Sequence, residues 1–290
     1  MTDLGLITNV NGDKLRLTSD GIFDFNYNPE GLPVSYETHY GNYNISYNPQ
    51  VITVPDGDAT ISYSLNGVGY FSSAHIEMEW KDYKYGEAYK GSGDMSFSYD
   101  GDGHLVKVTQ SASGYYVEDG AKYSTSETGV IELTWTDGKL MKASVIYNSN
   151  DGGEISAETN TYTFEYASAH SNPLAQFSHN MVDAYCMFGD ESELFAFFGF
   201  YGKPSNAFPT KVTMSFTDTD TGGNVRTYTH YPSYSFNSDG TLSSERYLGT
   251  YNYRYSNSAS VSKSKAIKSP YLKEQNSTKR HRLFRLHKAQ

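Results

Sequence analysis

The 290-residue chain contains a single cysteine, Cys186, which excludes an internal disulfide and any zinc site built from several cysteines. Its longest apolar run, residues 194–201, is interrupted by Gly199 and is far shorter than the roughly 20 residues of a membrane-spanning helix. The N-terminal residues lack the basic start and the apolar core of a signal peptide. The sequence therefore predicts no transmembrane helix, and two interpretations of its start stay open: an export signal has been removed, or the protein is cytosolic.

The short motifs that mark common enzyme classes are also missing. The sequence has no His-Glu-x-x-His, no Gly-x-Ser-x-Gly, no phosphate-binding loop and no dinucleotide fingerprint. Its eight histidines are scattered, and an isolated one such as His75, His104 or His230 is more often a surface or core residue than a ligand. We therefore assign no catalytic, cofactor-binding or metal-ligating residue from the sequence, and we expect no cofactor.

Charge is unevenly distributed along the chain. Residues 1–260 hold 14 Lys and Arg against 32 Asp and Glu, a net charge of −18, whereas residues 261–290 hold 9 against 1, a net charge of +8. An acidic body does not suit nucleic acid, because clustered cations are needed to displace the phosphate counterions. Residues 259–290 read as a basic, disordered tail, whose run 279–282 either touches an anionic surface or the acidic body, or has no fixed partner.

Composition and local pattern both indicate β-structure. Aromatic residues make up 15% of the chain, with 27 Tyr and 15 Phe. In residues 94–109, Met95, Phe97 and Tyr99 alternate with serines, an Asp-Gly-Asp-Gly turn follows, and Leu105 begins a second apolar stretch. A period of two on either side of a glycine-containing turn predicts a β-hairpin.

The same unit recurs: two aromatic or apolar residues separated by one residue, a turn with glycine, then leucine. Further copies lie at residues 25–32, 133–140 and 234–242, and partial copies at 45–49 and 162–166. Their irregular spacing does not fit a solenoid of fixed period. Repeated hairpins within one sheet are the better interpretation.

Other strands are predicted from the same alternation and from Asn, Asp, Gly and Pro turn signals. They comprise residues 5–10, 14–18, 22–27, 32–40, 43–47, 59–65, 74–85, 115–117, 123–126, 130–135, 140–147, 156–166, 211–217, 225–231, 233–236, 242–248 and 251–255. Residues 148–153 are predicted to form a turn.

Residues 172–208 interrupt the β pattern. Phe177, Met181, Tyr185 and Phe188 are spaced by four, four and three residues, which predicts a helix. Cys186 would lie in that helix among apolar neighbours, as a buried structural thiol.

A second short helix is predicted directly afterwards. Residues 190–193 read as its cap, and Gly199 and Gly202 end it. We expect the whole helical insertion, residues 176–201, to pack on the sheet and to cover an end or a face of it.

One pair of carboxylates could serve catalysis. On the predicted strand 74–85, Glu77 and Glu79 share a face, about 6.6 Å apart at a rise of about 3.3 Å per residue. Such a separation would suit a glycoside hydrolase. We favour the alternative, a solvated strand face, because such pairs are common on exposed strands.

Two acidic loops, residues 100–103 and 218–224, could offer oxygen ligands to calcium. Neither matches the EF-hand loop, which needs a bidentate acid at its twelfth position. The turn-forming chemistry of Asp, Asn and Gly is the preferred explanation.

Two features together carry a family resemblance. One is the repeated aromatic pair, Asp or Asn turn, glycine and leucine; the other is the segment 198–212, Phe-Gly-Phe-Tyr-Gly-Lys-Pro-Ser-Asn-Ala-Phe-Pro-Thr-Lys-Val. Over most of residues 5–255 the chain resembles a family of exported lipoproteins from gut-type Bacteroidetes, a domain of unknown function with a porin-like fold. The repeated unit is also similar to the YD repeats of bacterial surface and toxin-shell proteins.

The resemblance implies a cell-envelope or extracellular location of the outer-membrane lipoprotein type, with a lipid anchor in the full-length precursor, and it implies no catalytic residues. This chain departs from the family in showing neither an export signal nor a lipid-bearing cysteine at its start.

The predicted fold is therefore all-β: a long antiparallel meander curled into an open or half β-barrel, with the helical insertion capping it. More than ten strands in one open sheet must curl, close or split. Residues 1–258 are predicted to form a single domain, followed by the tail.

The predicted function is a non-enzymatic envelope or surface module that binds a glycan, a peptide or an envelope protein. Tyrosines on half-exposed strand faces could stack on such a ligand, although they could equally fill a curved core. The alternatives are a glycan-acting hydrolase that uses Glu77 and Glu79, and an outer-membrane β-barrel.

Overall fold

The computed structural model describes residues 6–38, 41–48, 51–56, 59–82, 87–167, 171–184, 194–218 and 223–257. These residues are mostly strand, with two short helices. Several predicted features lie outside the described residues, namely Tyr185, Cys186, Phe188, the helix cap at 190–193, most of the loop 218–224 and the tail 259–290.

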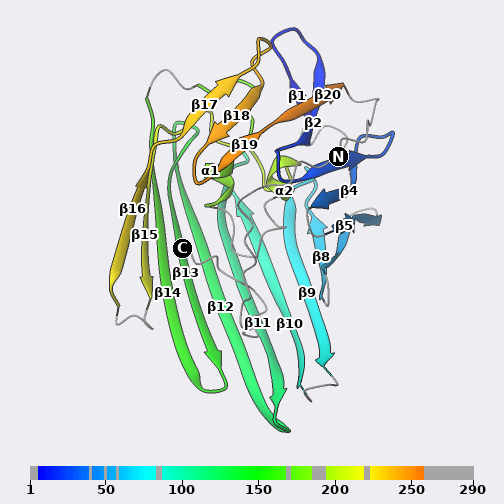
Figure 1. Cartoon of the computed structure of the whole chain (residues 1–290), viewed down its shortest axis with the longest axis vertical. Helices are drawn as coiled ribbons and strands as arrows, with labels where there is room; N and C mark the ends of the chain where they lie inside the picture. The colour runs from blue at the N-terminus through cyan, green and yellow to red at the C-terminus, as the bar shows by residue number, and fades with distance from the viewer. Residues whose placement is uncertain are drawn as a thin grey trace.

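Eleven strands form one long antiparallel sheet in which neighbours in space are neighbours in sequence (Figure 1). They are β6 (Ser46–Asn48), β7 (Val51–Asp56), β8 (Ala59–Leu65), β9 (Phe71–Asp82), β10 (Glu87–Tyr99), β11 (Leu105–Glu118), β12 (Ala121–Thr136), β13 (Lys139–Asp151), β14 (Glu154–Glu165), β15 (Lys211–Asp218) and β16 (Val225–His230). The predicted long meander is confirmed.

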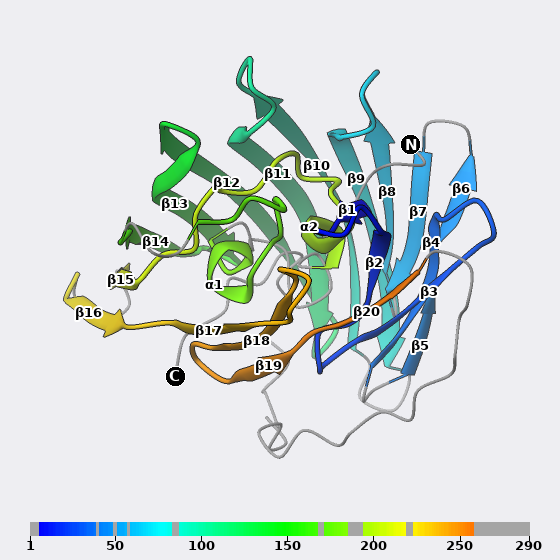
Figure 2. The same ribbon diagram turned by 90° about the horizontal axis from the view of Figure 1, so that it is seen from above.

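The remaining strands build two smaller sheets, so the prediction of one continuous sheet is wrong. One holds β1 (Leu6–Thr8), β2 (Lys14–Ser19), β3 (Asp24–Tyr27), β4 (Pro33–Thr38), β5 (Gly41–Asn44) and β20 (Arg254–Asn257), with β20 paired to β2. The other holds β17 (Ser233–Phe236), β18 (Leu242–Arg246) and β19 (Thr250–Asn252). Figure 2 shows the long sheet curving around the helices, with the smaller sheets opposite. The sheets do not close into a barrel, which confirms the predicted open form.

Three of the four copies of the repeated sequence unit share one turn geometry, whereas the copy at 133–140 turns on Asp137 and Gly138, with φ of 51° and 70°. In the turn Asp100–His104, the Asp100 side-chain Oδ1 accepts the backbone N–H groups of Asp102 and His104 at 3.0 and 2.9 Å, and Gly103 has φ of 91°. Only glycine adopts such a φ without strain. In the backbone of this turn, the Asp100 N–H donates to the His104 carbonyl and the Gly103 N–H donates to the Asp100 carbonyl. The same two backbone bonds and a positive-φ glycine recur in the turns that begin at Asn9, Asn28, Asn66 and Asn237.

The long strands run further than predicted. Residues 110–114 and 127–129 were expected to separate short strands, yet every one of them is paired within β11 and β12. Likewise β13 continues to Asp151, and the turn that was predicted over 148–153 is confined to its last residues, Gly152 and Gly153. The weak strand propensity of Ser, Gly and Asn is overridden because both neighbouring strands supply backbone partners.

The first helix of the insertion is shorter than predicted. The first helix, α1, is a single turn at His179–Val182 rather than an extended helix from residue 177. The second, α2, spans Leu194–Phe197, and Gly199 follows it with φ of 79°. The predicted second helix and its glycine end are confirmed.

The insertion packs inside the curve, as expected, through aromatic side chains. The Phe195 ring lies 5.3 Å from the Phe71 ring of the long sheet, and Tyr63 stacks on Phe71 at 4.3 Å. Phe198 meets Phe25 of the first small sheet edge-on at 5.2 Å. These rings belong to one buried cluster that joins helix and sheets, so the core lies on the concave side.

The opposite, outer face of the long sheet is polar. Ser96 and Thr109 are hydrogen-bonded across β10 and β11 at 2.7 Å, and Lys107 pairs with Glu132 at 3.1 Å. A lipid-facing barrel surface is an apolar band, so these strands do not favour the outer-membrane alternative. Among the described residues, no helix is long and apolar enough to span a membrane.

Two glycines of one turn give a matched test of the turn geometry. Gly103→Ala should lower the free energy of unfolding by about 1–2 kcal/mol, because a side chain disfavours the left-handed backbone. Gly101→Ala should change it by less than about 0.5 kcal/mol, since its Cβ would meet no atom within 4 Å and its φ is not positive. Urea unfolding of both variants measures the difference, and equal losses would contradict this account of the turn.

Candidate functional site

Glu77 and Glu79, the one catalytic pair suggested by sequence, lie together on the exposed outer face of β9. Glu79 is 3.0 Å from the Lys90 ammonium and 3.2 Å from that of Lys81, while Glu77 is 3.6 Å from His75. The Lys90 and Lys81 ammonium groups lower the pKa of Glu79. A glycosidase acid needs a raised pKa, so the geometry fits the solvated face rather than the hydrolase.

The turn after β10 brings three possible metal ligands together. One ligand atom each from Asp100, Asp102 and His104 lies within 4.8 Å of the others. The Asp100 carboxylate, however, already accepts the turn's backbone N–H groups, and the buried His104 ring stacks on Trp135 at 4.3 Å. These contacts show that Asp100 and His104 stabilise the turn, which is the explanation that the sequence favours over a metal site.

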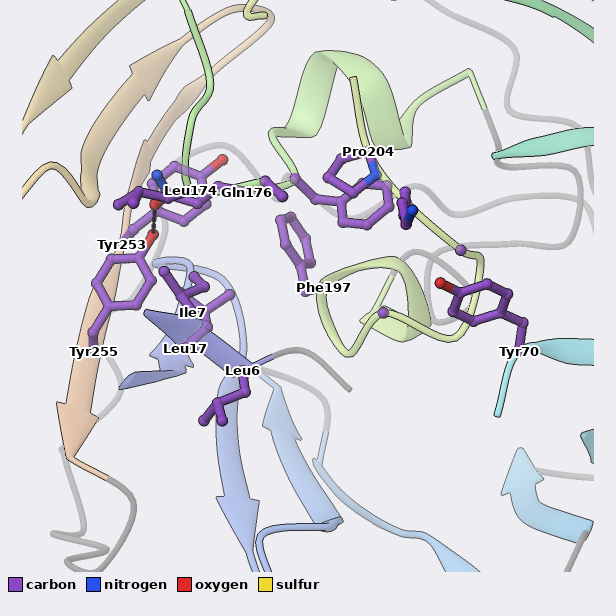
Figure 3. A pocket seen from close by; sticks show the side chains of 15 residues that line it. Leu6, Ile7, Leu17, Tyr70, Leu174, Gln176, Phe197, Pro204, Tyr253 and Tyr255 are labelled. Carbon is purple, nitrogen blue, oxygen red and sulfur yellow. Dashed lines mark hydrogen bonds between the residues drawn. The ribbon is translucent and has the colours of Figure 1, made fainter. Parts of the chain in front are cut away.

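A cavity of about 180 Å³ lies where the first small sheet meets the insertion (Figure 3). Its lining is mostly apolar and includes Leu17, Phe197 and Tyr255. Gln176 contributes a side-chain amide to this lining. Its Oε1 accepts the Leu242 backbone N–H at 2.7 Å and the Tyr255 hydroxyl at 3.1 Å. Because this polar group is already used by the fold, the cavity carries no clear signal for a ligand.

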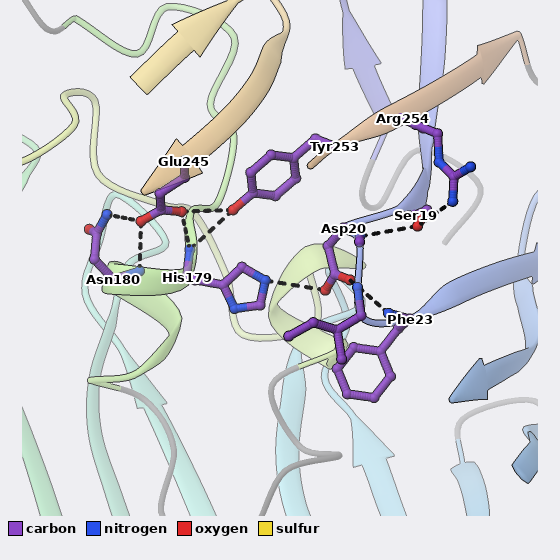
Figure 4. A network of polar contacts seen from close by, with 10 residues as sticks. Ser19, Asp20, Phe23, His179, Asn180, Glu245, Tyr253 and Arg254 are labelled. Atoms are coloured by element: carbon purple, nitrogen blue, oxygen red, sulfur yellow. Dashed lines mark hydrogen bonds and ion pairs between the residues drawn. The ribbon is translucent and has the colours of Figure 1, made fainter. Parts of the chain in front are cut away.

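A buried carboxylate from β18 caps helix α1 (Figure 4). Glu245 is fully buried, and its two oxygens accept the backbone N–H groups of His179 at 2.8 Å and Asn180 at 3.1 Å. They also accept the Tyr253 hydroxyl at 2.7 Å and the Asn180 side-chain amide. Ser178, at the N-cap position, makes no side-chain cap bond, so Glu245 supplies the missing acceptor and the negative charge that a helix N-terminus favours.

The same helix turn reaches the first small sheet through His179. Its Nε2 lies 3.3 Å from Oδ2 of the fully buried Asp20, and its ring stacks on Tyr251 at 3.6 Å. The other Asp20 oxygen accepts the backbone N–H groups of Ile22 and Phe23, both at 2.8 Å. The network therefore joins β2, α1 and β18. We interpret it as structural, because its carboxylate oxygens are engaged in backbone bonds and ion pairs.

The inner face of the long sheet changes character along the strands. Direct pairing aligns Phe97, Val108, Ile131 and Val145 in one apolar row. The next rows toward the other end of the strands mix polar side chains with glycines and with Met95, Ala112 and Tyr147. We call their polar members, with Asn160 of the first row, the polar floor: Gln110, Thr125, Glu127, Ser149, Asp151, Ser156, Glu158 and Asn160.

The polar floor is buried although it carries charge. Its residues are 5–7% exposed, apart from the half-buried Asp151. Neither side-chain atom of the Gln110 amide has a hydrogen-bond partner among the described residues. The register places no Lys or Arg in these rows across β10–β14, so the described floor is acidic through Glu127, Asp151 and Glu158.

Small residues and tyrosines border the floor. A Cβ on Gly114 would lie 2.5 Å from the Lys90 carbonyl oxygen and 3.0 Å from the Tyr89 hydroxyl, so glycine lets the Tyr89 side chain lie against the sheet. Burial, with a smaller contribution from the Glu127 carboxylate, raises the pKa of Tyr89 to about 12. At the far end, the rings of Tyr116 and Tyr123 stack at 4.9 Å.

Sequence reasoning missed the polar floor. The alternation that starts at Met95 and Phe97 predicts a strand, whereas the Ser, Ala and Gly at 110–114 and the residues 127–129 predict breaks between strands. Continuing the period of two through Val108 would have placed Gln110 on the inner face. The partner of each inner residue could not be read in this way, because it depends on register across strands.

No protein-family model matches the chain, and no curated protein matches it. Among solved structures it is similar to a porin-like protein from Bacteroides uniformis ATCC 8492, with 15% sequence identity and a TM-score of 0.44. That similarity covers 87% of this chain and 94% of the other. A likeness this distant carries no argument about function.

The cap on α1 can be tested by one isosteric change. Glu245→Gln should lower the free energy of unfolding by about 1.5–3 kcal/mol, because an amide cannot accept all the bonds that the carboxylate accepts. Glu79→Gln, on the outer face, is the matched control and should leave the urea midpoint unchanged. Equal effects of the two changes would show that Glu245 is not the cap that we describe.

Proposed function

We propose that the protein is a non-enzymatic module of the cell envelope that binds a glycan on its polar floor. One observation carries the proposal: a buried inner surface displays carboxylates, amides and hydroxyls, including the Gln110 amide with no partner among the described residues. Binding sites combine such convergent polar groups with an enclosed shape.

The chemistry of the floor favours a glycan among the ligand classes considered. Sugar hydroxyls both donate and accept hydrogen bonds, which suits the mixture of Glu127, Gln110 and Ser149. The stacked pair Tyr116 and Tyr123 offers flat ring surface at the end of the floor. An anionic ligand fits poorly, because the rows hold carboxylates and no Lys or Arg.

The location and the absence of catalysis belong to the same proposal. The resemblance to envelope lipoproteins supports an envelope or extracellular location, with a lipid anchor in the precursor. The hydrolase alternative loses its support because Glu77 and Glu79 lie on the outer face in ion pairs.

Glycan binding can be tested with two variants of one strand. A glycan array identifies bound sugars, and calorimetry then compares Glu127→Gln on the inner face with Glu132→Gln on the outer face of β12. We expect Glu127→Gln to weaken binding about tenfold to a hundredfold, because a hydrogen bond to a charged group contributes about 1.5–3 kcal/mol. Glu132→Gln should bind like the unmodified chain.

Three results would contradict this proposal. The first is the absence of binding to every glycan on the array, and the second is equal weakening by both variants. The third is release of shortened sugars from a bound glycan, measured by chromatography, which would show an enzyme in place of a binding module.

A further inference from the structure

The long sheet ends at β16, which pairs with β15 and with no other described strand. In Figures 1 and 2 it forms the outer edge of the sheet, and no described element lies beyond it. Its residues from Val225 to Thr229 are all exposed. An antiparallel strand with one neighbour uses only part of its backbone N–H and C=O groups, so the remaining groups of β16 point away from the fold.

This edge is longer than the other edges of the described sheets, and it lacks the usual protection. β16 has six residues, whereas the other edge strands, β1, β5, β6, β17, β19 and β20, have three or four. It contains neither Pro nor Lys, and its register with β15 is uninterrupted. Short strands, Pro, Lys and β-bulges are common means of preventing an edge from pairing. β16 is therefore open to a further strand.

We propose that β16 pairs with β16 of a second copy of this chain, in antiparallel order, about a two-fold axis that passes between the two Thr227 residues. The two long sheets then become one continuous sheet. The inference goes beyond the proposed function, and it does not use the polar floor.

The two faces of β16 limit the registers that such a pair can adopt. Tyr228 is paired with the buried Met214, so it lies on the inner side together with Arg226. Thr227 and Thr229 lie on the outer side, because successive side chains alternate. A two-fold axis perpendicular to the sheet keeps the inner faces of both copies on the same side. Each residue must then lie opposite one of the same face, so the axis passes through a residue position and not between two.

Arg226 selects among these registers. With the axis at Thr227, Arg226 of each copy lies opposite Tyr228 of the other, whose side chain is 40% exposed. A guanidinium group over a tyrosine ring is favourable. With the axis at Tyr228, Arg226 would lie opposite His230, and with the axis at Arg226 the two guanidinium groups would meet. Like charges directly opposite each other destabilise a strand pair, and an axis nearer either end would shorten the pairing.

Other occupants fit the edge less well. Pairing of β16 with β6 of another copy would build an open chain of molecules, but β6 has only three residues and is followed by Pro49, which has no N–H to donate. An extended peptide of another protein would use the same backbone groups, and it would leave the purified chain monomeric. The complementarity of Arg226 and Tyr228 within one strand favours the second copy. Because two six-residue edges form a small interface, we expect a weak, reversible dimer.

Cysteine crosslinking tests the position of the axis. In a Cys186→Ser background, Thr227→Cys places two thiols directly opposite each other, with Cα atoms about 4.5–5.5 Å apart, a separation that a disulfide spans. Thr229→Cys, on the same face of the same strand, is the matched control. Its two thiols would lie four residues out of register, about 13 Å apart along the strands. Non-reducing electrophoresis after mild oxidation measures the covalent dimer.

We expect the covalent dimer to form at least about tenfold faster with Thr227→Cys than with Thr229→Cys, because only the first pair lies within disulfide range. Equal rates, or faster crosslinking of the control, would overturn the proposed pairing.

Sedimentation velocity tests the dimer without a crosslink. The unmodified chain should change from one chain to two as its concentration rises. Thr227→Lys should remain monomeric, because two ammonium groups would meet at the axis. Thr128→Lys, exposed on the interior strand β12, is the matched control and should dimerise like the unmodified chain. Arg226→Gln should weaken the dimer about tenfold, because it removes two cation–π pairs.

The proposal fails if the unmodified chain stays monomeric at every concentration, if it grows beyond two chains, or if both lysine variants dimerise equally well. None of these measurements involves a glycan, so their failure and the failure of the glycan proposal are separate results.

Discussion

The packing of a few phenylalanines between the sheets is the interaction on which the rest of the structure depends. An eleven-stranded sheet cannot stay flat and open in water, because one face would expose its apolar residues. The insertion covers these apolar residues on the concave side, where Phe195 packs against Phe71 and Phe198 contacts Phe25 in the first small sheet. The buried Glu245 then caps the turn of α1 and ties it to β18. The same aromatic contacts therefore hold the long sheet curved and form the hydrophobic core.

That arrangement divides the strands β11–β14 into two parts. Where the insertion lies, the inner residues are apolar, as in the row from Phe97 to Val145. Beyond the insertion, the same face carries Gln110, Glu127 and Glu158. An apolar surface in this second part would have joined the core and closed the curve, whereas a polar one keeps the concave face available to a polar occupant. The proposed glycan-binding function follows from this division.

Much of the local structure could be predicted from the sequence, and the reasons are visible at single residues. The alternation around Met95 and Phe97 needs only the two-residue period of a strand. The turn from Asp100 needs an acceptor side chain and a glycine three residues later. The merging of short strands into β11 and β12 was not predictable in the same way, since a Ser or Gly there pairs only because neighbouring strands are already present. The start of α1 was not predictable either, because the carboxylate that caps it belongs to Glu245, which is distant in sequence.

By itself, the sequence determined the β class, the repeated turns, the helical insertion and the opposite charges of body and tail, because each of these depends on residues close together in the chain. Only the tertiary structure decided that Glu77 and Glu79 face outward, with Glu79 between two lysines, while Gln110, Glu127 and Glu158 meet on one inner surface. The physical reason is register: a shift of one residue between strands would exchange the two faces, and pairing across five strands, which no single segment encodes, sets which carboxylates share an enclosed surface.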